Sequence, residues 1–249
     1  MYNKPGKYAS RFPLRDGNLK IRNMDQKEQT SGHRQRLKEK FRRTAGEGLH
    51  DYELLELLLT YALPRRDVKP LAKELIARFD GLAGVLDATP EDLEKVKGIG
   101  TSPAVLIKLA KHLSEQYLAD GMMSRDALSS PQSVLAFART KMAGLPNEAF
   151  LCIYLNTKNE VLRYKTINQG TVDKAAVYPR RIIEEALNLH AAGLILVHNH
   201  PSGHCQPSPE DRQLTDSIVS VAKALDIRVL DHIIVGRAGH YSFAENKLI

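Results

Sequence analysis

The chain has few cysteines and no long apolar run, and these absences exclude several classes of protein. It has two cysteines, Cys152 and Cys205, too few for a disulfide scaffold or a four-cysteine zinc site. No apolar run is long enough to cross a bilayer, and the first residues lack the basic-then-apolar layout of a secretory signal. We therefore expect a cytoplasmic protein without a membrane partner, in a compartment that keeps the cysteines reduced.

The composition fits a folded protein with a mild basic excess. The chain has 249 residues, of which 43% are hydrophobic, enough for one large domain or two small ones with a real core. The formal net charge of +7 permits contact with nucleic acid or with an acidic protein surface, but it identifies neither.

The pattern of the chain changes along its length. Residues 1–30 are polar and predict a basic, disordered tail. Residues 31–120 have helical patterning, residues 121–130 are the expected linker, and residues 131–249 mix strands and helices. The predicted fold is thus a small all-α, helix-hairpin-helix-like domain followed by an α/β domain with a mixed sheet.

Individual elements follow from apolar spacing and from start and stop signals. In the first half we expect helices near 34–41, from Asp51 as cap to Pro64, over 67–79, from Thr89-Pro90 onward, and over 102–117. In the second half we expect strands at 150–155, 161–167, 193–198, 227–235 and 241–243, with helices at 180–189 and 209–225.

A short glycine-rich turn lies between two of the expected helices. Gly98 and Gly100 flank one isoleucine, as in the hairpin of helix-hairpin-helix DNA-binding modules, where backbone N–H groups approach a phosphate. Lys95, Lys97 and Lys108 would add attraction that does not depend on base sequence. A tight turn that packs on its own core explains the same residues, and the turn alone does not choose between the two.

Two histidines follow the apolar run at 193–197. Residues i and i+2 of a strand share a face, so His198 and His200 can bind one metal ion side by side. Asp211, eleven residues after His200, can supply a third ligand and leave the fourth position to water. That is the pattern of a catalytic rather than a structural zinc site, with one Zn²⁺ per chain.

The acid at Asp211 also has a local explanation. Ser208 is a suitable helix N-cap, Pro209 suits the first helical position, and acids favour the first turn. Capping and metal ligation are compatible. Ser208 is close enough in sequence to offer its hydroxyl to an oxyanion, although a cap alone would account for it.

Hydrolysis by a zinc-activated water also needs a general base. Glu148 directly precedes an apolar strand, where site residues are common, and spacing gives it a modest preference as the base. The other upstream acids are Glu160, Glu184 and Glu185.

The spacing of these residues resembles a known signature. His198-Asn199-His200-Pro201, Ser208 and Asp211 are similar in type and separation to the JAMM (MPN+) zinc metalloprotease motif. The resemblance implies that His198, His200 and Asp211 bind zinc. It also implies that Glu148 is the base and that Ser208 stabilises the oxyanion.

The chain resembles the bacterial RadC-like (UPF0758-type) proteins more closely still, over nearly everything after the tail. This family was once labelled DNA repair protein RadC, a label that is no evidence of mechanism. Arg181 departs from the family, which usually has an acid there, and this puts the substrate preference in doubt. The implied fold is the deaminase-like MPN domain. The resemblance rests on Asp51-Tyr52-Glu53-Leu54-Leu55, Lys97-Gly98-Ile99-Gly100, Gly170-Thr171-Val172-Asp173, His198-Asn199-His200-Pro201-Ser202-Gly203, Leu230-Asp231-His232-Ile233 and Ser242-Phe243-Ala244-Glu245.

Other candidate residues have ordinary explanations. Cys205 could approach the metal, but a spare loop thiol is the simpler interpretation, and Cys152 is expected in the core. Asp231 and His232 could steady the site from behind the ligands or could serve only the strand end.

Three functions follow from these patterns. The leading hypothesis is a zinc-dependent hydrolase that cleaves a peptide or isopeptide bond in a protein or peptide substrate. The alternative is a DNA-associated adaptor, for repair or recombination, with a structural or vestigial metal site. A nuclease or deaminase is the third: the letters His-Asn-His are a coincidence with HNH nucleases, and no Cys-x-x-Cys pair supports a zinc deaminase.

Overall fold

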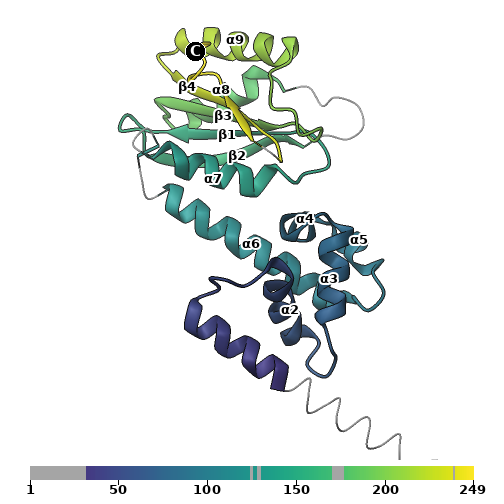
Figure 1. Cartoon of the computed structure of the whole chain (residues 1–249). Coiled ribbons are helices and arrows are strands. Elements are labelled where there is room, and N and C mark those ends of the chain that lie inside the picture. Colours follow the sequence, from purple (N-terminus) through teal and green to yellow (C-terminus); the bar gives the residue numbers. More distant parts are fainter. Residues whose placement is uncertain (1–31, 124–125, 128–129, 170–176, 238) are drawn as a thin grey trace, which may run out of the picture. The chain divides into compact units, whose positions relative to one another are not determined.

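The computed structural model describes residues 32–123, 126–127, 130–169, 177–237 and 239–249 (Figure 1). The expected tail at 1–30 and the motif at 170–173 therefore lie outside the described residues. The chain divides into two compact units, Met1–Arg78 and Phe79–Ile249. Among the described residues, no helix combines the length and the apolar character that crossing a bilayer requires.

The described part of the first unit, residues 32–78, is helical. Its core is formed by leucines spaced four apart on two helices, Leu55 and Leu59 on one and Leu71 and Leu75 on the other, all at most 4% exposed. Its helices span residues 32–44, α2 (Asp51–Ala62) and α3 (Lys69–Arg78).

The cap of α2 differs from the prediction. The N-cap is His50, and Asp51 is already the first helical residue, so the prediction of Asp51 as cap was wrong. The helix begins there because the Glu53 carboxylate accepts a hydrogen bond of 2.9 Å from the His50 backbone N–H.

The second unit begins with α4 (Leu82–Asp87), α5 (Pro90–Glu94) and α6 (Thr101–Met123). Thr89 caps α5 as predicted, with its hydroxyl accepting from the Asp92 N–H at 3.1 Å. α6 continues past Tyr117 into the start of the expected linker at 121–130, because Ala119 and Met122 are buried in the core beneath the sheet. The limits expected for the two domains remain a prediction.

A further helix, α7 (Pro131–Met142), was not predicted. Its buried residues Val134, Phe137, Ala138 and Met142 have the i, i+3, i+4, i+8 spacing of an amphipathic helix, so the sequence did contain the signal.

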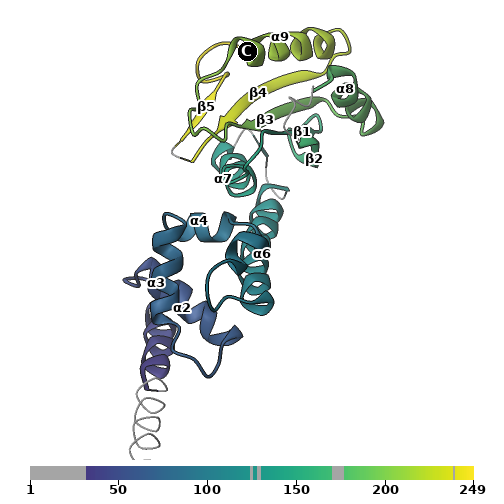
Figure 2. The same ribbon diagram turned by 90° about the vertical axis from the view of Figure 1, so that its right-hand side faces the viewer.

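A five-stranded mixed sheet forms the centre of the second unit, in the order β2-β1-β3-β4-β5 (Figure 2). β1 is antiparallel to β2 and β3, β3 is parallel to β4, and β4 is antiparallel to β5. The mixed sheet confirms the predicted fold class. The strands are β1 (Ala149–Leu155), β2 (Val161–Gln169), β3 (Gly193–Asn199), β4 (Arg228–Val235) and β5 (His240–Ser242).

Helices cover both faces of this sheet (Figure 1). α8 (Pro179–Asn188) and α9 (Pro209–Lys223) pack on the face that carries Phe150, Cys152 and Tyr154 of β1. α6 and α7 pack on the opposite face, among Leu151, Ile153 and Leu155. Since β3 has helices on both faces and strands on both edges, all its residues are buried, as its apolar run predicted.

Candidate metal site

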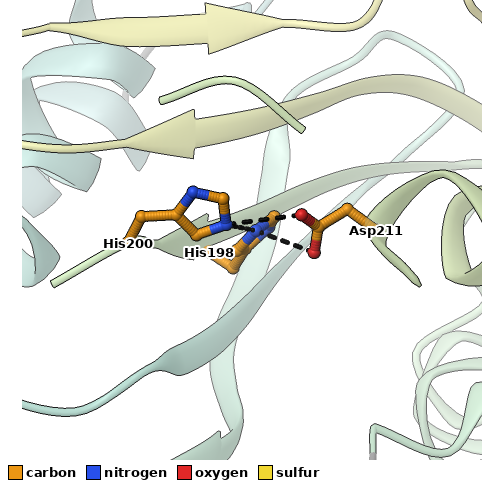
Figure 3. A group of neighbouring side chains, drawn as sticks. All are labelled: His198, His200 and Asp211. Carbon is orange, nitrogen blue, oxygen red and sulfur yellow. Dashed lines mark hydrogen bonds and ion pairs between the residues drawn. The ribbon is translucent and has the colours of Figure 1, made fainter. Parts of the chain in front are cut away.

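The two histidines at the end of β3 point to the face covered by α8 and α9. His198 stands opposite Phe150 of β1, and the two rings stack with their centroids 6.1 Å apart. Asn199 alternates to the other face, and His200 returns to the first one. The alternation of a strand therefore brings the two imidazoles side by side, and the start of α9 brings Asp211 to them (Figure 3).

The three side chains meet at their metal-binding atoms. The two Nε2 atoms of His198 and His200 are 2.9 Å apart. The Asp211 carboxylate lies 3.1 Å from His198 Nε2 and 3.3 Å from His200 Nε2. Ligands at about 2.0–2.1 Å from a tetrahedral zinc are about 3.3 Å from one another. The separations therefore suit one zinc ion. Within the described part of the chain, this is the group of histidines, cysteines and acids that could hold a metal.

Hydrogen bonds behind His198 determine which of its nitrogens carries the proton. The Thr215 hydroxyl donates to the Asp211 carbonyl oxygen at 2.6 Å, so the same hydroxyl must accept from His232 Nδ1–H, also at 2.6 Å. Burial lowers the pKa of His232 well below its ordinary value, so this ring is neutral and its Nε2 is an acceptor. His198 Nδ1–H donates to it at 2.8 Å, which leaves a lone pair on His198 Nε2.

A backbone carbonyl fixes the proton of His200 on Nδ1, as the hydrogen bonds behind His198 do for that ring. Its Nδ1–H donates to the His204 carbonyl oxygen at 2.7 Å, so its Nε2 also presents a lone pair to the site. Two lone pairs and a carboxylate within about 3 Å of one another need a positive charge between them. The donor set therefore fits a zinc ion.

The pKa shifts of His200 and Asp211 also indicate that a positive charge is favoured between the three side chains. The Asp211 carboxylate raises the pKa of His200 above its ordinary value, because it would accept a hydrogen bond from Nε2 once that nitrogen takes up a proton, and the charge of Glu148 adds to the rise. Burial raises the pKa of Asp211, but hydrogen bonding to the two imidazoles outweighs burial and holds that pKa far below the ordinary value. The carboxylate therefore favours a positive charge beside the two Nε2 atoms, which a proton or a metal cation can supply.

Ser208 connects the Asp211 carboxylate to the start of α9. Its hydroxyl accepts from the Asp211 N–H at 3.1 Å and donates to Asp211 Oδ2 at 2.6 Å. The same carboxylate oxygen accepts from the Ser208 N–H at 2.8 Å, which closes a capping box. Ser208 is therefore the helix cap that the sequence indicated, while its oxyanion role stays a prediction.

Glu148 lies directly before β1 with an exposed side chain. The β1–β3 ladder begins with Phe150 opposite His198, so Glu148 precedes by two residues the position paired with one histidine of the group. Its negative charge contributes to the raised pKa of His200.

The other acids considered as bases are engaged or exposed elsewhere. Glu160 accepts a hydrogen bond from Asn156 at the opposite end of β1. Glu185 is paired with Arg163 and Lys165, and Glu184 is exposed on α8.

Of the remaining candidate residues, His232 contacts the metal group, and the two cysteines and Asp231 lie outside it. Cys152 is buried in the core as expected, and Cys205 lies outside the His–His–Asp group. His232 stands behind His198, whereas Asp231 accepts hydrogen bonds from Ser242 and Ala244 and holds the C-terminal segment. Sequence reasoning missed Thr215. Its position four residues after Asp211, one turn along the same helix, was the available signal.

The glycine turn joins α5 to α6. Gly98 has a φ of +104°, which favours glycine, and Ile99 is buried beneath the turn. The Lys108 ammonium donates to the carbonyl oxygens of Leu86 and Ala88 at the end of α4, at 2.7 and 3.0 Å. Lys97 is exposed.

Comparison with protein families agrees with both halves of the chain. The model of the RadC-like JAB domain matches residues 128–248, and the UPF0758 N-terminal model matches residues 29–105. JAB domains form a family of metal-dependent hydrolases, and the His–His–Asp group lies within the matched region. The chain therefore belongs to the RadC-like proteins, with a UPF0758 N-terminal region followed by a RadC-like JAB (MPN) domain.

Proposed function

We propose that the protein is a zinc-dependent hydrolase that cleaves peptide or isopeptide bonds in a protein or peptide substrate. The observation that carries the proposal is the convergence of two imidazole lone pairs and one carboxylate, 2.9–3.3 Å apart. The set has three protein ligands, which leaves one corner of a tetrahedron open for chemistry.

Each residue has a distinct task in this proposal. His198, His200 and Asp211 would hold one zinc ion, which lowers the pKa of water and polarises a carbonyl group when bound. Glu148 would take the proton of the attacking water and pass it to the leaving amine. The Ser208 hydroxyl accepts from the Asp211 N–H and donates to Asp211 Oδ2, and it would turn its hydrogen from that carboxylate toward the oxyanion of the tetrahedral intermediate.

The metal assignment is tested by zinc content. Purified protein should hold one zinc per chain by mass spectrometry of the metal, and His200→Ala should lose most of it. His112→Ala is the control, because that histidine is exposed on α6 and outside the metal group. Wild-type protein without stoichiometric metal would contradict the proposal.

The base is tested by turnover. Zinc-loaded protein is incubated with a proteome-derived peptide library and with lysine-linked isopeptides, and new termini are read by mass spectrometry. Glu148→Gln should keep its zinc and lose turnover, while Glu184→Gln on the exposed side of α8 should keep both. Unchanged turnover in Glu148→Gln would remove Glu148 from this role.

The inactive Glu148→Gln variant also serves to identify the substrate. It should retain proteins at the intact metal site, and these can be identified by mass spectrometry. Proteins retained equally by Glu148→Gln combined with His200→Ala are not substrates, because that variant lacks a metal ligand.

A second candidate function is DNA binding through the turn between α5 and α6, either beside hydrolysis or in an adaptor whose metal site is structural. Three features support it. Gly98 has its positive φ, Gly100 faces open space, and both Lys97 and the first residue of α6, Thr101, are exposed. The other two lysines expected to contact DNA have partners within the protein. The Lys95 ammonium pairs with Asp92, and the Lys108 ammonium donates to the Leu86 carbonyl oxygen in α4.

Binding of the full chain to labelled duplex DNA tests this candidate. The affinity should fall steeply with salt, and Lys97→Ala should weaken binding and reduce the salt slope by about one. Lys158→Ala, in the exposed turn after β1, is the control. Binding that Lys97→Ala leaves unchanged would exclude the turn as the contact, and salt-dependent binding without any hydrolysis would favour the adaptor.

A further inference from the structure

Asn199 lies between the two histidines, yet its side chain leaves the sheet on the opposite face. It is 0% exposed, and a buried primary amide needs partners for its hydrogen-bonding atoms. Those partners are not metal ligands. Both are backbone groups at the start of β1.

The two ends of this amide hold the two peptide bonds on either side of Glu148. Asn199 Oδ1 accepts a hydrogen bond of 2.8 Å from the Ala149 N–H. Asn199 Nδ2–H donates to the Asn147 carbonyl oxygen at 3.2 Å. The Asn147 carbonyl belongs to the peptide that precedes Glu148, and the Ala149 N–H belongs to the peptide that follows it. One side chain thus restrains both backbone torsions of Glu148.

These bonds lie where the regular pairing of the strands stops. The β1–β3 ladder begins with Phe150 opposite His198, so the Asn199 side chain continues the connection beyond the ladder. Asn199 itself is firmly placed, because it pairs with Val235 of β4 and the next residue donates its N–H to the Val235 carbonyl at 3.0 Å.

We propose that Asn199 is a positioning residue that sets the Glu148 carboxylate at a fixed place relative to the metal ligands. The proposal rests on the proposed function, in which Glu148 is the base. The two histidines of the metal group and the restraint on the base come from three consecutive residues at the end of β3 and just after it. Any shift of the strand end therefore moves ligands and base together.

A merely structural role for Asn199 makes different predictions. A buried asparagine that only stabilises the sheet would lower stability when removed, with no selective effect on what Glu148 does. A positioning residue should lower kcat with little change in KM, because a displacement of about 1 Å can cost about 100-fold in rate. It should also have no further effect once Glu148 is disabled.

The decisive test is a double-mutant cycle in zinc-loaded full-length protein, measured on the best-cleaved peptide of the library. Asn199→Ala should keep one zinc per chain, lower kcat about 100-fold and leave KM within about twofold. In the Glu148→Gln background, Asn199→Ala should change the residual rate by less than about twofold. Losses that multiply in the double variant would overturn the proposal.

The matched control is Asn156→Ala. Asn156 directly follows β1, and its Oδ1 accepts from the N–H groups of Lys158 and Glu160 at 2.8 and 3.0 Å. This variant also removes an asparagine that holds backbone at one end of β1, but at the end remote from the metal group. It should keep kcat. If Asn199→Ala folds poorly, Asn199→Ser keeps a polar group but is too short to reach both backbone groups, and its kcat should fall likewise.

A second measurement does not depend on hydrolysis. In the zinc-loaded Asn199→Ala variant, hydrogen exchange of the Ala149 amide should accelerate at least about tenfold, while the Ile153 amide in the middle of β1 stays protected. A crystal structure of the variant should show Glu148 displaced by about 1 Å with the histidines unmoved. An unmoved Glu148 and an unchanged Ala149 amide would overturn the proposal. If no peptide is cleaved by wild-type protein, the proposed function fails, and these two measurements still decide whether Asn199 holds Glu148.

Discussion

At the scale of single residues, the metal site depends on the direction in which a short series of hydrogen bonds runs. The series passes from His198 through His232 and Thr215 to the Asp211 carbonyl, with steps of 2.8, 2.6 and 2.6 Å. Because a carbonyl oxygen can only accept, it fixes the direction of every donor before it. A ligand's backbone thus determines which nitrogen of another ligand faces the metal.

Removing the hydroxyl in the middle of this series should weaken zinc binding. Thr215→Val keeps the shape of the side chain but leaves His232 Nδ1–H without its acceptor, so His232 no longer favours the tautomer that accepts from His198. We expect the zinc dissociation constant to rise about 10- to 100-fold, measured by competition with a fluorescent chelator.

A second buried threonine provides the control for this substitution. The Thr60 hydroxyl donates to the Leu57 carbonyl at 2.6 Å within α2, in the first unit. Thr60→Val should leave the zinc affinity unchanged. An equal loss in both variants would mean that the effect comes from general destabilisation.

Much of the site could be predicted at this scale, and the limit has a physical cause. The proximity of His198, His200 and Asp211 follows from strand alternation and from the start of a helix, which are local rules. The contacts of Thr215 with His232 and of Asn199 with Asn147 join segments far apart in the chain. No local pattern in the sequence records such contacts.

At the scale of elements, the first turn of α9 combines the Ser208 cap with Asp211, the proposed metal ligand. Ser208→Gly separates the two tasks of the serine, since glycine at an N-cap costs only a few tenths of a kcal/mol but has no hydroxyl. We expect a small loss in the free energy of unfolding together with a loss of about 100-fold in kcat. Zinc content is measured in parallel, and a full kcat in this variant would reduce Ser208 to a cap.

The first turn of α2 gives a prediction about pH. The hydrogen bond from the His50 N–H lowers the pKa of Glu53 below its ordinary value, and Lys40 adds to this effect. Since the folded-state pKa is depressed, the stabilisation is present above the unfolded-state pKa and is lost as the pH falls through the folded-state value. Glu53→Gln should therefore cost about 0.3–1 kcal/mol at pH 7 and less at pH 3.

Urea unfolding of the wild type and of Glu53→Gln at the two pH values measures this difference. The exposed acid Glu94 near the end of α5 gives a control, because Glu94→Gln removes a carboxylate that has no place in the α2 cap. A difference for Glu53→Gln that is as large at pH 3 as at pH 7 would assign the loss to packing rather than to charge.

The elements show where prediction from sequence stops. The five strands were predicted because alternation and apolar runs are strong signals, and β3 and β1 match almost residue for residue. The end of α6 was not predicted. The helix continues through Gly121 because Ala119 and Met122 pack against the sheet core. Burial in the tertiary structure outweighs the low helix propensity of glycine there.

At the scale of the whole molecule, a metal that binds only the folded state should stabilise it. Zinc at about 100 times its dissociation constant should add about 2.7 kcal/mol, and for a unit of this size that corresponds to a rise of about 5–10 °C in melting temperature. Differential scanning fluorimetry with zinc and with a chelator measures the change. His200→Ala should melt at the same temperature under both conditions, and a wild-type protein indifferent to the chelator would contradict the prediction.

The central place of β3 in the sheet has a consequence for how the ion exchanges. A strand hydrogen-bonded on both edges and covered on both faces opens rarely, whereas the first turn of a helix frays readily. The two histidine side chains are therefore held rigidly, and Asp211 is the most mobile of the three side chains in the metal group. Departure of a bound ion would begin with unwinding of the first turn of α9 at Ser208, so the lifetime of the bound state should depend mainly on that turn.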